Sequence, residues 1–350
     1  FNLMYPGDFN IIDAFGGILG FAGPGLDAAA AADLSYSEGY TYWTDFLFQG
    51  MFAATAGTII SGAVAGRIKI NAFMLIVFLY VLIVYPIVGS WQWGGGFLST
   101  FTDEVGFYDF AGSTLVHSVG GWGGLVIIYL LGARKGKFDS SGKAVAIPGS
   151  NIPLSAAGVL ILWLGWFGFN GGSVLSADPA NTSLVLVTTC LAAAAGGLGA
   201  SFLSTLMYKN LDITMFMNGV LGGLVGITAG ADQMGPTSAI IIGAIGGAVV
   251  VLGVALLDKC KLDDPVGAIP VHLFAGIWGT LAVGLFGASA GFDQFMVQLA
   301  STGIVGVFCV IGASIIALIV KSIMGLRVSD EEEEIGLDIS EHGTKAYFSS

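Results

Sequence analysis

Two histidines lie inside apolar stretches at the same distance from an aspartate. Asp109 precedes His117 by eight residues in "DFAGSTLVHS", and Asp264 precedes His272 by eight residues in "DDPVGAIPVHLF". A neutral imidazole has one donor and one acceptor nitrogen, so it can bind a small polar molecule or relay a proton. Ionisable groups within a membrane span are costly and usually line a pathway or polar cavity. The pair predicts a shared pore site, and a plain interhelical hydrogen bond is the alternative.

The composition predicts the elements that hold these histidines. The chain has 55% hydrophobic and 10% charged residues with a mean hydropathy of +0.85, whereas soluble domains carry about 25% charged residues. Its 55 glycines favour close helix packing. We therefore predict an all-α polytopic membrane protein, a tight helical bundle. Apolar runs of about 20 residues predict nine spans: 44–65, 70–90, 111–132, 151–171, 182–207, 213–230, 236–256, 265–286 and 295–321.

The basic residues predict the orientation of the spans, because short cytoplasmic loops are rich in Lys and Arg. All twelve fall in alternate connections or the tail: Arg67, Lys69, Arg134, Lys135, Lys137, Lys143, Lys209, Lys259, Lys261, Lys321, Arg327 and Lys345. The other connections carry carboxylates instead: Asp103, Glu104, Asp109, Asp178, Asp232 and Asp293. We therefore expect residues 1–43 to form an extracellular or periplasmic segment, 44–327 the transmembrane domain, and 328–350 a cytoplasmic tail.

This topology places the two histidines at matching depth from opposite faces. Each lies about eight residues along its span, or roughly 12 Å deep at 1.5 Å per residue. Matching segments of opposite direction predict inverted repeats with a site at the bilayer midplane, and a chance match of spacings is the alternative. Asp109 and Asp264 fit helix N-caps. A capping carboxylate also adds negative potential near a cation path, and Asp109, on the outer side, is the better functional candidate.

Other residue patterns narrow the function. Two histidines without clustered Cys or carboxylates underfill most metal sites, which disfavours a metal transporter, and we expect no metal, cofactor or nucleic-acid partner. No motif combines a nucleophile, a base and an orienting group, so we do not expect an enzyme. The tail carries seven acidic residues in "SDEEEEIGLDISEHGTKAY", which fits either a solvated, partly disordered end or a docking and regulatory segment.

Several motifs carry a family resemblance. "FQGMFA", "DFAGSTLVH", "LGWFGFNGGS", "DDPVGAIPVHLFAGIWGTLAVGLF" and "GLRVSDEEEEIGLDISEHGTKAY" resemble the Amt/Mep/Rh ammonium transporter family, microbial Amt type, over residues 40–350. The resemblance implies eleven helices with an inverted repeat, so the first two would be absent from this sequence. It also implies a homotrimer in the cell membrane and a regulatory tail on which PII-type signalling proteins can act.

The resemblance also implies roles for eight residues. His117 and His272 would be the twin pore histidines, and Asp109 the acidic residue below the outer vestibule. The remaining five would serve the vestibule: Phe52, Trp93 and Ser173 as an outer cation site, Phe52 with Phe169 as a stacked phenyl gate, and Trp166 as a neighbour. The predicted topology puts Phe52, Trp93, Phe169 and Ser173 on the outer side.

The implied function is an ammonium transporter or channel. A full cation at the bilayer centre costs from about 3 to more than 10 kcal/mol, and burial favours a neutral amine. We therefore expect ammonium to be recruited outside, deprotonated, and conducted as ammonia with or without its proton. A membrane ammonium sensor that binds but hardly conducts is the alternative.

Overall fold

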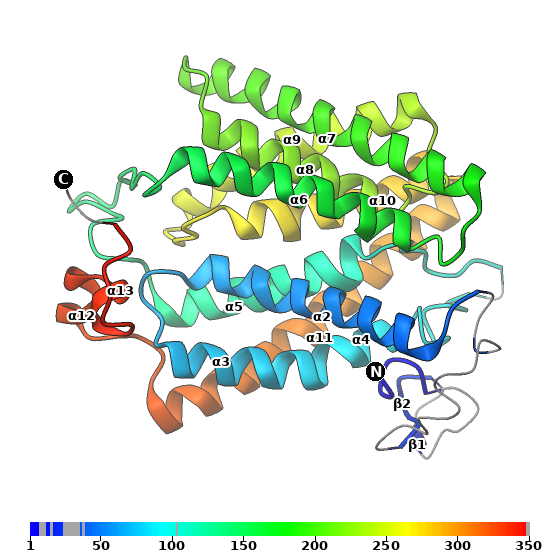
Figure 1. The fold of residues 1–350 in the computed structure, drawn as a ribbon, viewed down its shortest axis with the longest axis horizontal. Helices are drawn as coiled ribbons and strands as arrows, with labels where there is room; N and C mark the ends of the chain where they lie inside the picture. The colour runs from blue at the N-terminus through cyan, green and yellow to red at the C-terminus, as the bar shows by residue number, and fades with distance from the viewer. Residues whose placement is uncertain (7–11, 15–16, 24–35, 37–38, 103, 348–350) are drawn as a thin grey trace.

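The computed structural model describes residues 1–6, 12–14, 17–23, 36, 39–102 and 104–347, and in this part it is a helical bundle (Figure 1). In chain order the helices are α2 (Tyr42–Val64), α3 (Ile70–Leu79), η2 (Tyr80–Val84), α4 (Tyr85–Ser90), η3 (Ser113–Ser118), α5 (Val119–Leu131), α6 (Ile152–Gly172), α7 (Pro179–Tyr208), α8 (Ile213–Thr228), α9 (Pro236–Lys259), η4 (Ile269–Phe274), α10 (Ala275–Phe286), α11 (Phe292–Met324), α12 (Asp330–Ile335) and α13 (Leu337–Ser340). The three η elements are π-helices that continue directly into α-helices.

The predicted spans are confirmed as helices. Eight are long and apolar enough to cross a bilayer, with η2, η3 and η4 counted as parts of their spans. The ninth, α8, has 16 residues, or about 24 Å at 1.5 Å per residue, against about 30 Å of hydrocarbon core. Most of its residues are buried among neighbouring helices, so this short helix belongs to the interior of the bundle.

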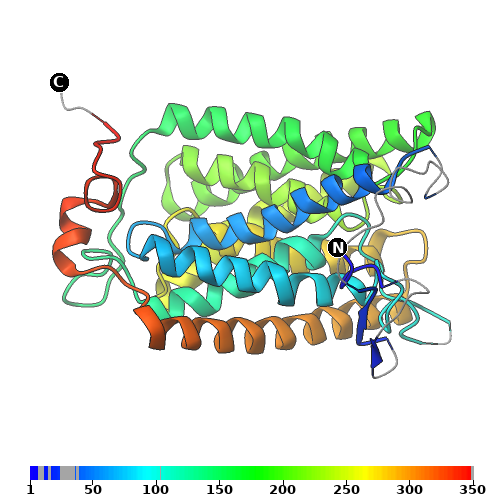
Figure 2. The ribbon, with the colours of Figure 1, turned by 60° about the horizontal axis from the view of Figure 1, so that its bottom comes forward.

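The bundle has two parts. Helices α2 to α5 lie with α11 in one, and α6 to α10 form the other (Figure 1). Figure 2 shows α11 extending along one edge over the length of the bundle. Within the second part the helices approach closely at glycines: a Cβ added at Gly246 would lie 2.6 Å from the Gly222 carbonyl oxygen. Small residues permit such backbone contact between membrane helices, as the glycine content predicts.

The connections gather at two ends. Loops 65–69, 132–151, 209–212 and 260–268 lie at one end together with α12 and α13, and we call this the basic end. Loops 91–112, 173–178, 229–235 and 287–291 lie at the other, which we call the aromatic end. Consecutive spans therefore alternate in direction, as the distribution of Lys and Arg predicts.

The chain ends add two features that the helix pattern does not predict. Near the N-terminus, β1 (Ile12–Ala14) pairs antiparallel with β2 (Leu19–Phe21), with Ile12 opposite Phe21. Parts of the predicted 1–43 segment lie outside the described residues. At the other terminus, the tail folds back on the bundle, where residue Arg327 forms a β-bridge with Ile68. The start of the tail therefore lies against the bundle, where the Val328 N–H also donates to the Arg67 carbonyl.

Candidate functional site

The first histidine segment begins with an aspartate that caps a wide helical turn. Both carboxylate oxygens of Asp109 are fully buried and accept backbone N–H groups of Gly112, Ser113, Thr114 and Leu115 at 2.8–2.9 Å. Gly112 has a φ of +104°, which glycine adopts without the Cβ clash of other residues. This cap starts η3, and η3 carries His117.

The second histidine segment has the same aspartate cap and runs in the opposite direction. Asp264 accepts the backbone N–H of Gly267 at 3.1 Å and of Ile269 at 2.7 Å. Gly267 also has a positive φ, +76°. η4 follows and carries His272, running from the basic end while η3 runs from the aromatic end. The shared Asp, Gly and His spacing therefore corresponds to one structural unit used twice, which agrees with the predicted inverted repeat.

The two segments bring the histidines together. The Nδ1 atoms of His117 and His272 lie 3.2 Å apart, and the rings are nearly parallel at 21°. One Nδ1 must donate and the other accept, which requires at least one neutral imidazole. His117 is fully buried and His272 half-buried. The Nε2 of His117 has no hydrogen-bond partner among the described residues, so it is available to a guest molecule.

Aromatic rings connect the histidines to the aromatic end. Trp93 meets Phe52 edge-on with ring centroids 6.0 Å apart. Phe52 stacks on Phe169 at 4.1 Å and 15°, and Phe169 lies 5.3 Å from His117. These contacts form a continuous column, which we call the aromatic column, from Trp93 to the paired imidazoles. Its residues come from α2, α6, η3, η4 and the loop after α4.

Three further predicted residues, Trp166, Asp109 and Ser173, contact this column through ring stacking or hydrogen bonds. Trp166 stacks against His117 at 5.1 Å, and its indole N–H donates to the Thr228 hydroxyl. The indole of Trp93 donates to the backbone oxygen of Asp109 at 2.9 Å. The hydroxyl of Ser173 donates to the Phe169 carbonyl at 2.8 Å. All eight predicted residues therefore belong to one connected set, with Ser173 linked through a helix-end hydrogen bond.

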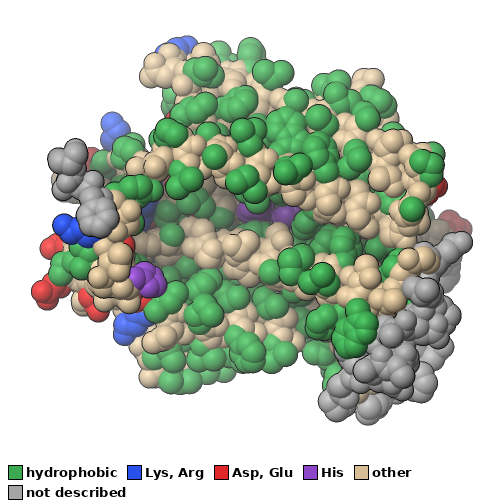
Figure 3. All heavy atoms as spheres, viewed as in Figure 1, with side chains coloured by type: hydrophobic (Ala, Val, Ile, Leu, Met, Phe, Trp, Pro, Cys, Tyr) green, Lys and Arg blue, Asp and Glu red, His purple; other side chains and the backbone are tan. Residues whose placement is uncertain are grey.

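A hollow leads to the histidines from the side of the bundle. Figure 3 shows it between the two parts of the bundle, with histidine side chains at its floor. Hydrophobic side chains cover most of the surface on both sides of it. The side chain of His272 is half-buried, which agrees with a hollow that reaches it. The paired imidazoles thus lie in an apolar environment that is not closed on every side.

A cluster of charges at the basic end was not predicted from the sequence, in which Arg67 and Arg134 were used only for orientation and Asp263 was not considered. Asp263, 1% exposed, accepts the Nε and Nη2 of Arg134 at 2.8 and 2.9 Å and the Arg134 backbone N–H at 2.8 Å. Fully buried Arg67 donates to the backbone oxygens of Asp263 at 2.6 Å and Gly132 at 3.1 Å. We call Arg67, Arg134 and Asp263 the basic-end junction.

The electrostatics of this junction follow from burial and pairing. Burial alone would raise the pKa of Asp263, but the hydrogen bonds and charge of Arg134 outweigh it and hold this pKa below its ordinary value. Burial lowers the pKa of Arg67 to about 10, although the nearby Asp263 opposes the shift. Both side chains therefore remain charged at neutral pH.

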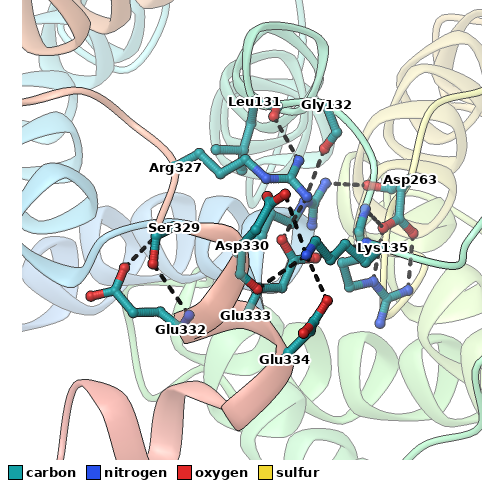
Figure 4. Close-up of polar contacts among 12 residues, drawn as sticks. Leu131, Gly132, Lys135, Asp263, Arg327, Ser329, Asp330, Glu332, Glu333 and Glu334 are labelled. Atoms are coloured by element: carbon teal, nitrogen blue, oxygen red, sulfur yellow. Dashed lines mark hydrogen bonds and ion pairs between the residues drawn. The ribbon is translucent and has the colours of Figure 1, made fainter.

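The tail contacts the same loops (Figure 4). Arg327 donates to the Leu131 carbonyl at 3.0 Å and pairs with Glu333 at 2.7 Å. Lys135 pairs with Glu334 at 2.7 Å, and its backbone N–H donates to Glu333 at 2.8 Å. Acidic residues of α12 thus bind the segment that leaves α5.

Known proteins are similar to this chain in sequence and fold. The family description "Ammonium Transporter Family" matches residues 1–347. Ammonium transporter Amt2 of Archaeoglobus fulgidus is 40% identical over 374 residues, covering 97% of this chain and 80% of the relative. A structure described as a sensor Amt protein has a TM-score of 0.86 at 33% identity, covering 97% and 84%. Mep2 of Candida albicans superposes with a TM-score of 0.82 at 26% identity, covering 98% and 78%. This chain belongs to the ammonium transporter family.

Proposed function

We propose that this protein conducts ammonia across the cell membrane after recruiting ammonium at its aromatic end. The observation that carries the proposal is the pair of imidazoles joined at 3.2 Å at the inner end of the aromatic column. A neutral imidazole pair can accept a hydrogen bond from a guest and donate one to it. It therefore suits a small molecule that is both donor and acceptor, which ammonia is.

The column would favour deprotonation before passage. At its outer end, the Trp93 face attracts a cation with about 0.5–2 kcal/mol, depending on desolvation. Deeper, the stacked Phe52 and Phe169 rings offer no charge to replace the hydration shell of ammonium, and an unpaired ion in an apolar setting is costly. Ammonium would bind at the outer end and lose its proton near the Phe pair. The proton would pass either to water on the outer side or to the relay formed by the neutral imidazoles, and the guest would pass His117 and His272 as ammonia. The buried Asp109 would contribute negative potential and fix η3, since backbone N–H groups occupy its oxygens.

The orientation, the assembly and the partner of the protein belong to the same proposal. The basic end would face the cytoplasm, by the positive-inside rule, with the 328–350 tail docked there and the 1–43 segment outside. A homotrimer and a PII-type partner at the cytoplasmic face follow from the family resemblance. Deletion of residues 328–350 should lower flux or its regulation while leaving membrane insertion intact, because Arg327 and Lys135 lose their acidic partners in α12. Wild-type transport and regulation after deletion would mean that the docked tail is only structural.

A sensor that binds ammonium but hardly conducts it is the second candidate. The similarity to a structure described as a sensor Amt protein and the closed Phe52–Phe169 stack both favour it. The two candidates predict the same outer binding site and differ only in what crosses the membrane.

Ammonium-evoked currents in proteoliposomes separate the candidates. A transporter should give a sustained, concentration-dependent current or, for neutral passage, an internal alkalinisation without current. A sensor should bind ammonium, seen as quenching of tryptophan fluorescence, with neither signal. The control is His117→Ala, which should lower the transport signal about five- to a hundredfold without changing outer binding. Absence of current, alkalinisation and binding in the wild type would overturn both candidates.

A further inference from the structure

The basic-end junction joins the loops of three spans that carry the aromatic column. Arg67 lies three residues after α2, and Arg134 lies three residues after α5. Asp263 lies six residues before η4. The spans concerned are those of Phe52, His117 and His272. The junction is thus the place where the chain fixes these spans relative to one another at the basic end.

We propose that Arg134 and Asp263 are positioning residues: with Arg67, they hold the two histidine-bearing spans so that the His117 and His272 rings stay within hydrogen-bonding distance. The inference rests on the proposed function, which it extends from the column to a contact at the end of the bundle. Neither residue touches the path of the guest molecule.

The contacts in the junction are strong enough for this task. Arg134 approaches Asp263 with two side-chain nitrogens and its own backbone N–H, and bidentate, charge-assisted bonds fix both distance and angle. Asp263 is almost fully buried. Removal of one partner from such a pair leaves a buried charge without compensation, so the two loops would have to move apart or admit water.

A movement at the junction reaches both histidines through stiff segments. On one side, the neighbour of Asp263 is Asp264, whose carboxylate caps η4 through Gly267 and Ile269. On the other side, the Gly132 carbonyl bound by Arg67 ends α5, which continues from η3. A hydrogen bond of 3.2 Å between the imidazoles tolerates only a few tenths of an ångström before it is lost. A small slip of one span against the other is therefore enough to separate the rings.

The same end of the bundle contains a matched control. Lys137 pairs with Asp258 at 2.9 Å. This pair also starts from the loop after α5, but it ends on the last turn of α9. It resembles the Arg134–Asp263 pair in charge and in its start in the loop after α5, but it joins this loop to α9 and not to the segment that precedes η4.

The test compares the variants Asp263→Asn and Arg134→Gln with Lys137→Gln and Asp258→Asn. Ammonium and potassium currents are measured in proteoliposomes from pH 5 to 8. Remote misplacement of reacting groups by about 1 Å costs up to about a hundredfold, and we expect the junction variants to lose potassium rejection about tenfold. The control variants should stay within about twofold of wild type, because Asp258 is partly exposed, whereas Asp263 is buried, and solvent screens a partly exposed pair. The swapped pair Arg134→Asp with Asp263→Arg should recover part of the rejection.

A second readout does not depend on transport. Nitrogen-15 NMR of histidine-labelled protein reports the shared imidazole hydrogen bond directly. The signal should be present in wild type and in the control variants and be weakened in Asp263→Asn. If Asp263→Asn does not assemble, Arg134→Lys and the swapped pair give the same comparison.

The outcomes separate the two proposals. A wild type that neither conducts nor binds ammonium contradicts the proposed function, while the NMR comparison still decides the role of the junction. Junction variants that match the Lys137 and Asp258 variants in both potassium rejection and NMR signal overturn the inference, and the junction is then a structural clamp only.

Discussion

The two histidine segments share a local design and differ in what anchors them. Both have an aspartate cap, a glycine with positive φ three residues later, and a histidine in a π-helix. Beside Asp109, the backbone of Tyr108 exchanges neutral hydrogen bonds with Gln298 at 2.6 and 2.9 Å. Beside Asp264, by contrast, Asp263 forms an ion pair. Sequence spacing therefore defines the turn that carries the histidine, and the flanking residue defines how this turn is attached to the bundle.

The two histidines also differ in how far their side chains are buried. His117 is enclosed by Trp166, Phe169 and its partner imidazole, while His272 is half-buried. A repeated unit thus gives one enclosed imidazole and one with access to the hollow.

The largest expected effect comes from removing either histidine. His272→Ala leaves both nitrogens of buried His117 without a partner, a penalty of about 1–3 kcal/mol, equivalent to about five- to a hundredfold in an equilibrium or rate. We expect ammonium flux to fall in this range for both alanine variants, with greater loss of stability in His272→Ala because His117 cannot turn to water. The measurements are proteoliposome flux and thermal unfolding in detergent.

An acidic replacement sharpens this test. A fixed negative charge in His272→Glu no longer requires the guest to shed its proton, so this variant should pass cations better than the alanine variant and reject potassium less. Full ammonium flux together with full potassium rejection in both alanine variants would show that the histidines are a structural polar pair.

The next effect concerns the caps. Asp109 holds four backbone N–H groups and Asp264 at least two. Asn offers one acceptor oxygen and turns an amide donor toward the remaining N–H groups. We expect Asp109→Asn to destabilise the protein by about 3 kcal/mol and Asp264→Asn by about 1.5 kcal/mol, given the usual strength of bonds to charged groups. Equal shifts of the unfolding midpoint would contradict the proposed difference between the caps.

Much of the fold could be predicted from the sequence, because the length of an apolar run and the charge of a loop can be counted directly from the residues. The span 70–90 agrees with Ile70–Ser90, and the site residues found through motifs lie together. The π-helical turns around His117 and His272 could not be predicted, since no residue type encodes them. The junction was missed because Arg67 and Asp263 are far apart in sequence, and burial of an arginine depends on tertiary packing. The only local signal was the Asp263–Asp264 pair, of which just the second residue was weighed.

Acid should affect the second segment more than the first. Its Asp263 has a pKa below the ordinary value, which is about 3.9 in an unfolded chain. The carboxylate therefore stabilises the folded protein fully at neutral pH, and this contribution is lost as the pH falls below about 3.9 toward the lower folded-state pKa. Thermal unfolding of wild type and Asp263→Asn should differ most at pH 7, and the difference should narrow as the pH falls below about 3.9. A difference that persists unchanged at pH 3 would show that the charge of Asp263 is not the cause.

The smallest expected effect lies at the outer end of the column. Trp93→Leu removes a cation–π contribution of roughly 1 kcal/mol, which corresponds to less than about tenfold in apparent affinity. Maximal flux should change less, because the histidines remain in place. Flux is measured against ammonium concentration, with Trp91→Leu as a control, since the Trp91 indole binds the Ile18 carbonyl and packs on Phe97 away from the column. An unchanged concentration dependence in Trp93→Leu would count against an outer binding site there.

The stacked rings of Phe52 and Phe169 would limit the rate of transport. Their centroids are 4.1 Å apart, so no molecule can lie between their faces while the stack is formed. In the proposed conduction, each crossing would have to wait for a thermal excursion of at least one ring, and buried side chains move more slowly than the picosecond-to-nanosecond flips of exposed ones. The frequency of these openings sets a ceiling on turnover that no rise in concentration can exceed. Cooling should lower that ceiling steeply, since it makes the excursions rarer.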